Sequence, residues 1–144
     1  MFHDALVPFA ERRIIIMKVT LNRVQKKLMC IEMAKHIPAI RELLHLNQKE
    51  FGAMTGISTD RLSRIENGHV VMTWSQLLSV VAICNLNTTT KEYLFMNNII
   101  PKKFFQYVQQ LDETIPPIYN VMLRDEVVES YNALKGEEND GDIW

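Results

Sequence analysis

The sequence is poor in the residues that build metal and redox sites. It contains only two cysteines, Cys30 and Cys84, which form no CxxC motif, and its four histidines show no metal-ligand spacing. We therefore expect no metal and no cofactor. Because lone cysteines commonly behave as small apolar groups, we expect both to be buried and to stay reduced in a cytoplasmic setting.

Long apolar runs are also missing, since no segment approaches the roughly 20 apolar residues that span a bilayer. Residues 1–16 have neither a basic start nor a small-residue cleavage site, which argues against a secretory signal. Met17 is an alternative start of the chain, in which case residues 1–16 are dispensable. The sequence has no nucleophile–base set and no glycine-rich phosphate loop, so we expect a protein that is not an enzyme.

An excess of positive charge is absent as well, because 16 Lys and Arg stand against 17 Asp and Glu. A protein that coats nucleic acid without sequence preference neutralises many phosphates, so this mode of binding is disfavoured. The charge is nevertheless uneven along the chain. Residues 1–35 carry seven basic and three acidic residues, residues 36–100 carry five of each, and residues 101–144 carry four basic and nine acidic residues.

The apolar residues that are present recur at helical spacing, and no alternating strand pattern is found. The sequence therefore predicts an all-α fold with a five-helix domain at 36–100. A basic amphipathic helix is expected at about 20–35 in an N-terminal extension (1–35), and it ends before Pro38 because the residue before a proline avoids the helical region. A C-terminal helical extension (101–144) is expected to hold helices near 102–111 and 118–135 and an acidic tail.

Helix ends are well marked in the middle of the chain. Pairs of capping residues three positions apart predict helix starts after Asn47, Thr73 and Thr89. Gly56 suits the left-handed conformation found at helix C-termini. Ser58 is a good N-cap for the next helix, which the pair Asn67-Gly68 ends. Two short helices joined by a tight turn are thus expected between residues 47 and 68.

A spaced set of residues runs through this region, consisting of Arg41, Asn47-Gln48, Gly56, Ser58, Leu62 and the segment Arg64-Ile65-Glu66-Asn67-Gly68. On these residues the region from Ile37 to about Phe95 resembles the phage-repressor/Cro-like (Xre) helix-turn-helix family. The resemblance covers about 60 of the 144 residues. Gly52 lies where the family usually has alanine, and glycine is expected to fit there at a cost of up to ~1 kcal/mol in helix propensity.

By this resemblance, the helix at 58–66 enters a DNA major groove, where its outward polar residues contact base edges. The DNA-binding residues that the resemblance implies are Gln48, Ser58, Thr59, Asp60, Arg61, Ser63, Arg64, Asn67 and His69. Arg64 suits guanine, and Asp60 suits the cytosine amino group. Asp60 departs from the family, whose members more often have a neutral or basic residue there, so an ion pair with Arg61 or Arg64 is the alternative role. Arg41 and Glu66 match a pair that forms an internal salt bridge in the family.

The resemblance implies a transcriptional regulator that binds double-stranded DNA as a homodimer on a pseudo-palindromic operator. Residues 101–135 are the first candidate for self-association, since their aromatic face (Phe104, Phe105, Tyr107, Tyr131) needs cover from the core or a second subunit. The helix at 20–35 is the second candidate. Two alternatives stay open. One is an antitoxin or adaptor whose extension binds a partner protein, and the other is an interaction module that has lost DNA binding.

Overall fold

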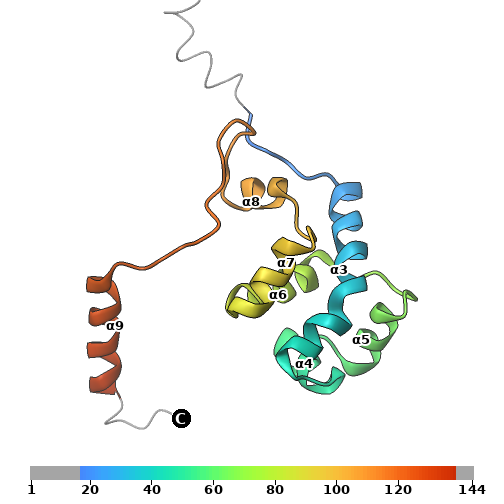
Figure 1. Cartoon of the computed structure of the whole chain (residues 1–144), viewed down its shortest axis with the longest axis horizontal. Coiled ribbons are helices and arrows are strands. Elements are labelled where there is room, and N and C mark those ends of the chain that lie inside the picture. The colour runs from blue at the N-terminus through green and yellow to red at the C-terminus, as the bar shows by residue number, and fades with distance from the viewer. Residues whose placement is uncertain (1–16, 139–144) are drawn as a thin grey trace, which may run out of the picture.

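The computed structural model describes residues 17–138, in which all regular secondary structure is helical apart from one isolated antiparallel bridge between Lys18 and Asp112. The helices, labelled as in Figure 1, are α3 (Arg23–Leu44), α4 (Gln48–Thr55), α5 (Thr59–Glu66), α6 (Trp74–Asn85), α7 (Thr88–Met96), α8 (Lys102–Val108) and α9 (Asp125–Glu138). The expected all-α class is confirmed. None of these helices is long and apolar enough to cross a membrane. The proposal that residues 1–16 are dispensable lies outside the described residues.

Helices α3 to α7 pack into one bundle around a continuous apolar core. The side chains at its centre are large and fully buried, among them Phe51 of α4, Leu62 of α5 and Leu77 of α6. Cys30 and Cys84 lie in the same core, as expected, and burial raises the pKa of both thiols, that of Cys84 to about 11. The bundle thus holds α4 and α5 against α3 and α6.

Helix α3 is one continuous helix where the sequence predicted two, so the expected helix end near residue 35 is wrong. Its true start is capped by Asn22, and Pro38 lies inside it. A proline in a helix interior costs ~3 kcal/mol because it removes a hydrogen bond and crowds the preceding turn. Met33, Ile37 and Ile40 around it are fully buried, and each such burial contributes ~1.5–3 kcal/mol. Packing therefore outweighs the proline, and a domain boundary at residue 35 would fall inside α3.

The start of α7 also differs from the prediction. The expected capping box of Thr89 and Glu92 is wrong, because Asn87 is the N-cap and its side chain accepts hydrogen bonds from the backbone N–H groups of Thr89 and Thr90. The buried Thr90 hydroxyl donates to the carbonyl of Cys84 at 2.9 Å. The short loop between α6 and α7 is therefore fixed by two polar side chains, one of which reaches the end of α6.

Helix α8 is part of the bundle rather than a free extension. Phe104 is buried against Trp74, and the Tyr107 ring also lies edge-on to Trp74. The segment before α3 is clipped to the end of α8 by a 2.8 Å hydrogen bond from the N–H of Val19 to the carbonyl of Leu111. Of the aromatic face expected in this region, Phe104, Phe105 and Tyr107 are thus covered by the chain's own core. Tyr131 is not.

Beyond α8 the chain stays on the bundle as far as residue 120 and then leaves it. The side chain of Gln109 bonds both backbone groups of Ile118, and Lys91 donates to the carbonyl of Tyr119 at 2.8 Å. These contacts hold residues 118–120 out of a helix, so the expected start of the last helix at 118 is wrong. We call residues 121–138 the C-terminal arm. It ends in α9, which stands clear of the bundle in Figure 1.

Candidate nucleic-acid interface

The site predicted from the sequence is built on α4 and α5 and the turn between them. Asn47 and Glu50 form the expected capping box at the start of α4. Gly56 ends that helix with a φ of 76°, a left-handed conformation that glycine adopts without strain. Ser58 then caps α5 by accepting a hydrogen bond from the backbone N–H of Arg61. The helix caps and the glycine turn that the sequence predicts in this segment are therefore all present in the structure.

The two helices approach each other closely at Gly52. A Cβ atom at this position would lie 2.4 Å from the carbonyl oxygen of Ile57, a separation that real Cβ atoms essentially never show. The backbone N–H of Ile57 also donates a 3.0 Å hydrogen bond to the carbonyl of Gly52. Glycine is therefore required by the tight approach of the turn to α4, and it is more than a tolerated replacement for alanine.

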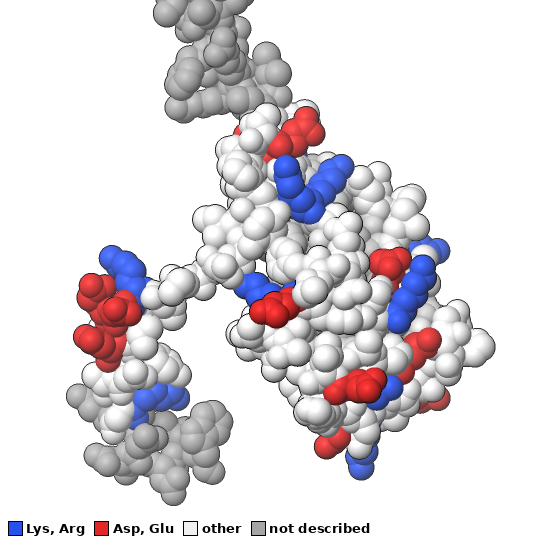
Figure 2. All heavy atoms as spheres, in the orientation of Figure 1, with Lys and Arg blue, Asp and Glu red and all other residues white. Residues whose placement is uncertain are grey.

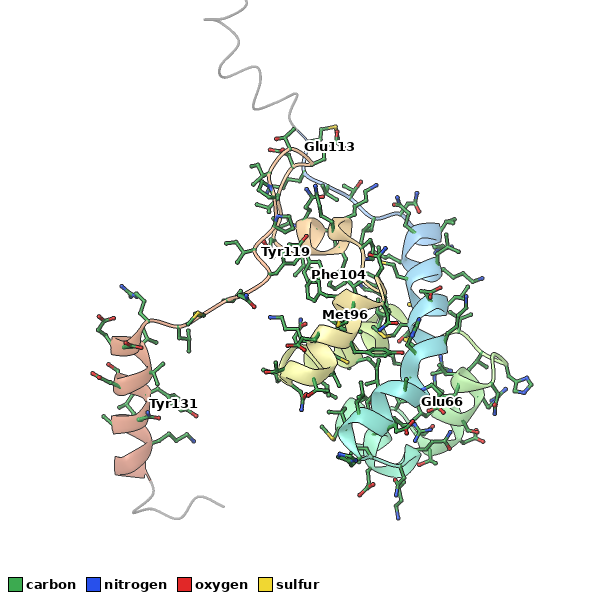
Figure 3. The ribbon with its side chains drawn as sticks, viewed as in Figure 1. Glu66, Met96, Phe104, Glu113, Tyr119 and Tyr131 are labelled. Carbon is green, nitrogen blue, oxygen red and sulfur yellow. The ribbon has the colours of Figure 1, made fainter. Side chains whose placement is uncertain are left out.

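A polar network ties α3, α4 and α5 together. Arg41 of α3 donates from Nε and Nη2 to the two carboxylate oxygens of Glu66 in α5, at 2.8 and 2.9 Å. Its Nη1 donates to the carbonyl of Leu46, and the hydrogen bonds to Glu66 raise the pKa of the Arg41 guanidinium above its usual value. The Arg41–Glu66 pair expected from the sequence is thus present. Figure 3 shows Glu66 between α3 and α5.

The opposite side of α5 is open to solvent. Leu62 and Ile65 fix the helix by burying their side chains, and Glu66 and Arg61 are bonded within the chain. Ser63 is half-buried, and the exposed residues of α5 and its flanks are Ser58, Thr59, Asp60, Arg64, Asn67, Gly68 and His69. A short helix therefore presents hydroxyl, carboxylate and guanidinium groups from a rigid support, an arrangement that suits hydrogen bonding to a partner's polar edges.

A family model described as helix-turn-helix matches residues 39–73, from the second half of α3 to the N-cap of α6. Residues 39–73 are therefore similar to a helix-turn-helix. Comparison of the chain with curated proteins and with solved structures gives no significant match. A helix-turn-helix of this type is the DNA-binding part of transcription regulators and places its second helix in the major groove. The second helix of the matched helix-turn-helix is α5 in this chain.

Two of the residues expected to contact DNA, Gln48 and Arg61, have hydrogen-bond partners within the chain. The amide of Gln48 donates to Glu66 Oε1 at 3.2 Å and so joins the network with Arg41. Arg61 donates from Nε to the side chain of Gln76 and from Nη2 to the carbonyl of Val71, both at 3.2 Å. Arg61 therefore fastens the loop after α5 to the start of α6. Sequence spacing could not reveal these partners, which lie 10 to 18 residues away in the chain.

Asp60 behaves differently from the alternative that the sequence left open. It is exposed, and among the described residues it forms no ion pair with Arg61 or Arg64, so the internal role is wrong. Lys49 was missed by sequence reasoning. It is exposed in the first turn of α4, where backbone N–H groups have no partner inside the helix, and this position is the signal that would have identified it.

The charges around the helix-turn-helix are sparse. On the face of the molecule that Figure 2 shows, basic and acidic side chains lie singly or beside one another, and no continuous basic patch is visible. Over residues 17–124 the chain carries 13 Lys and Arg against eight Asp and Glu, whereas residues 125–138 carry one Lys against five acidic residues. The acidic charge is thus concentrated in α9, and the rest of the described chain is moderately basic.

Proposed function

We propose that this protein is a sequence-specific transcription regulator that binds a pseudo-palindromic DNA operator as a homodimer, with α5 of each copy in the major groove. The observation that carries the proposal is the exposed face of α5, whose opposite face is fixed by packing and hydrogen bonds. Arg41, Gln48 and Glu66 lock the inner side of the helix-turn-helix. The outer side keeps its polar groups for a partner.

The exposed residues fall into two groups by what they can bond. Arg64 suits a bidentate contact with the O6 and N7 of guanine, and Asp60 accepts from the amino group of cytosine, while Thr59 suits either type of base. We assign Ser58, Ser63, Asn67 and His69 to phosphate or sugar, and Lys49 with the N–H groups at the start of α4 to a further phosphate contact. Base contacts then set sequence preference, and phosphate contacts set register.

Gln48 and Arg61 act indirectly in this proposal. Both side chains are half-buried and bonded within the chain. Gln48 holds the start of α4 against Glu66, and Arg61 holds the loop that carries His69. Their replacement is expected to weaken DNA binding by displacing these elements, without changing which bases are preferred.

The salt dependence of DNA affinity tests the proposal, and its slope reports how many phosphates this weakly basic domain neutralises. DNA enriched from a random pool is titrated with the full chain by fluorescence anisotropy at several salt concentrations. We expect specific affinity that falls with salt, but with a shallow slope because few phosphates are neutralised. No specific affinity even at low salt would contradict the proposal and favour the module that has lost DNA binding.

A second candidate function is an adaptor of the antitoxin kind, in which the same domain binds DNA and an extension binds a different protein. The observation in its favour is the exposed C-terminal arm. Purification of the chain from its native host separates the two functions, since an adaptor retains a second, different protein at a fixed ratio. A chain that elutes alone, or only with itself, contradicts the adaptor.

A further inference from the structure

The first two turns of α3 carry three cations in an unfavourable place. Arg23, Lys26 and Lys27 are among the first five residues of the helix, and its first turn has no acidic residue. The N-terminus is the positive end of the helix dipole, so cations are disfavoured there. Within residues 17–138, none of the three forms an ion pair. These charges therefore do not stabilise α3, and they are available to an external anion.

The three cations border one groove beside the helix-turn-helix, which we call the α3 groove. It has a volume of about 460 Å³, and its lining residues are Arg23, Lys26, Lys27, Val71, Met72 and Trp74. None of these six residues is acidic. The ammonium group of Lys26 lies 5.1 Å from the centre of the Trp74 ring and 5.3 Å from that of Tyr107, which holds it in place. The α3 groove is thus cationic on one side and bounded on the other by the segment between α5 and α6.

The face of α3 that carries these cations is also the face on which α5 lies. Intervals of four, seven and seven residues separate Arg23, Lys27, Ala34 and Arg41, so the four lie on one side of the helix. Arg41 bonds Glu66 of α5, and Ala34 borders a smaller groove with the same glutamate. Figure 1 shows the loop that leaves α5 running beside α3. Arg23 and Lys27 are therefore on the side of α3 that faces α5 and the loop after it.

The loop beside the α3 groove begins where α5 ends. Helix α5 has eight residues, a length of about 12 Å, and in the proposed complex its N-terminal residues contact the bases. The major groove of DNA is also about 12 Å wide. The end of α5 and residues 67–72 then lie at the edge of the major groove, where the phosphates of one strand run. This loop has no Lys or Arg, and the α3 groove supplies the positive charge that it lacks.

We propose that the α3 groove binds the phosphate backbone of DNA at one edge of each half-site, beside the major groove that α5 enters. This inference rests on the proposed function and extends its contacts to the first turns of α3, ahead of the segment that the family model matches. Arg23 and Lys27 bond phosphate oxygens through strong, charge-assisted hydrogen bonds, and Lys26 keeps the groove positive. Phosphate contacts carry no base preference, so this contact raises affinity without changing the preferred sequence.

Two matched double variants of the full chain test this contact. Arg23→Gln/Lys27→Gln removes one Arg and one Lys from the α3 groove, and the control Lys102→Gln/Arg124→Gln removes the same charges elsewhere. Lys102 borders a pocket at Asn85, the last residue of α6, whereas the α3 groove lies at the first residue of that helix. About 18 Å of helix separates the two places. All four replaced side chains are exposed, so circular dichroism should show unchanged folding of both variants.

The salt dependence of affinity for the selected DNA is the first readout. Each phosphate contact that is lost lowers the slope of log affinity against log salt by about 0.9. We expect the groove variant to lose about two contacts, so that a rise from about 50 to about 200 mM salt weakens its binding roughly tenfold less than that of the unmodified chain. The control should keep the unmodified slope, because a general effect of net charge would change both variants alike. All three proteins should select the same DNA sequence.

Ethylation of single phosphates, which removes their charge, then locates the contact on the DNA. Ethylation at one or two phosphates at the edge of each half-site should weaken binding of the unmodified chain and the control, but not of Arg23→Gln/Lys27→Gln. An unchanged salt slope, equal effects of the two double variants, or an ethylation pattern that the groove variant shares with the unmodified chain would overturn this inference and leave base contacts by α5 standing. If the unmodified chain shows no specific DNA affinity at all, the proposed function fails and the inference fails with it.

Discussion

The helix-turn-helix and the C-terminal arm use similar residues in opposite ways. In the helix-turn-helix, Leu62 and Ile65 are buried and Glu66 has two bonding partners. In the arm, Leu134 is 62% exposed and α9 stands in solvent. The first region is packed within one chain, whereas the apolar side chains of the second are largely exposed. Matched substitutions in the two regions test this difference.

The largest effect is expected at the charge network. Glu66→Ala should lower the free energy of unfolding by ~3–5 kcal/mol, because it leaves the largely buried guanidinium of Arg41 without its partner. Glu129→Ala in the arm removes the same carboxylate from an exposed position and should change stability by less than ~0.5 kcal/mol. Urea denaturation of dilute protein measures both. Equal losses would contradict the comparison.

The second pair of substitutions uses two helical glycines. Gly52→Ala should destabilise the chain by ~1–3 kcal/mol, since the added methyl group meets the carbonyl of Ile57. Gly136→Ala in α9 meets nothing within 4 Å and should instead strengthen its helix by up to ~1 kcal/mol. Thermal unfolding monitored by circular dichroism separates these opposite signs. A harmless Gly52→Ala would mean that the turn is looser than the structure shows.

The third pair concerns DNA affinity rather than folding. Arg64→Ala should weaken specific DNA binding by ~1–3 kcal/mol and leave the unfolding free energy unchanged, because Arg64 is exposed and lies on the outer side of α5. Arg124→Ala in the arm removes the same charge and should have a much smaller effect. If Arg64→Ala unfolded the domain and Glu66→Ala only weakened binding, the two faces of α5 would be assigned the wrong way round.

The smallest effect is chemical and reports on burial alone. The pKa of Cys84, raised to about 11 by desolvation, keeps its thiol protonated at pH 8, and the pKa of Cys30 is raised for the same reason. The thiolate is the reactive form, so iodoacetamide should modify neither residue in the folded chain below about pH 9. A cysteine introduced by Met122→Cys in the arm should react at the rate of a free thiol. Fast reaction of Cys84 would contradict its place in the core.

Much of the helix-turn-helix could be predicted from the sequence because its signals are local. The capping box of Asn47 with Glu50, the left-handed Gly56 and the cap of Ser58 each act within four residues. The pair Arg41–Glu66 followed from a resemblance instead. Capping residues and helix-ending glycines can be recognised in the sequence because they depend on backbone geometry that helix ends have in common.

The remaining features depend on contacts that spacing does not reveal. Pro38 indicated a break in α3, and only the burial of the residues around it shows why the helix continues. The requirement for glycine at position 52 comes from the carbonyl of Ile57, and the internal role of Arg61 comes from Gln76. The length of α9 was misjudged for the same reason, since Gln109 holds Ile118 outside the helix.

The central claim is that α5 contacts bases through its open face, and one measurement tests it most directly. DNA is selected from a random pool in parallel with the full chain and with its Arg64→Ala variant. We predict a pseudo-palindromic motif for the unmodified chain with half-sites about one helical turn apart. The variant should lose a guanine preference at one position of each half-site and keep the rest. Identical motifs for both proteins, or no enrichment for the unmodified chain, would contradict the account.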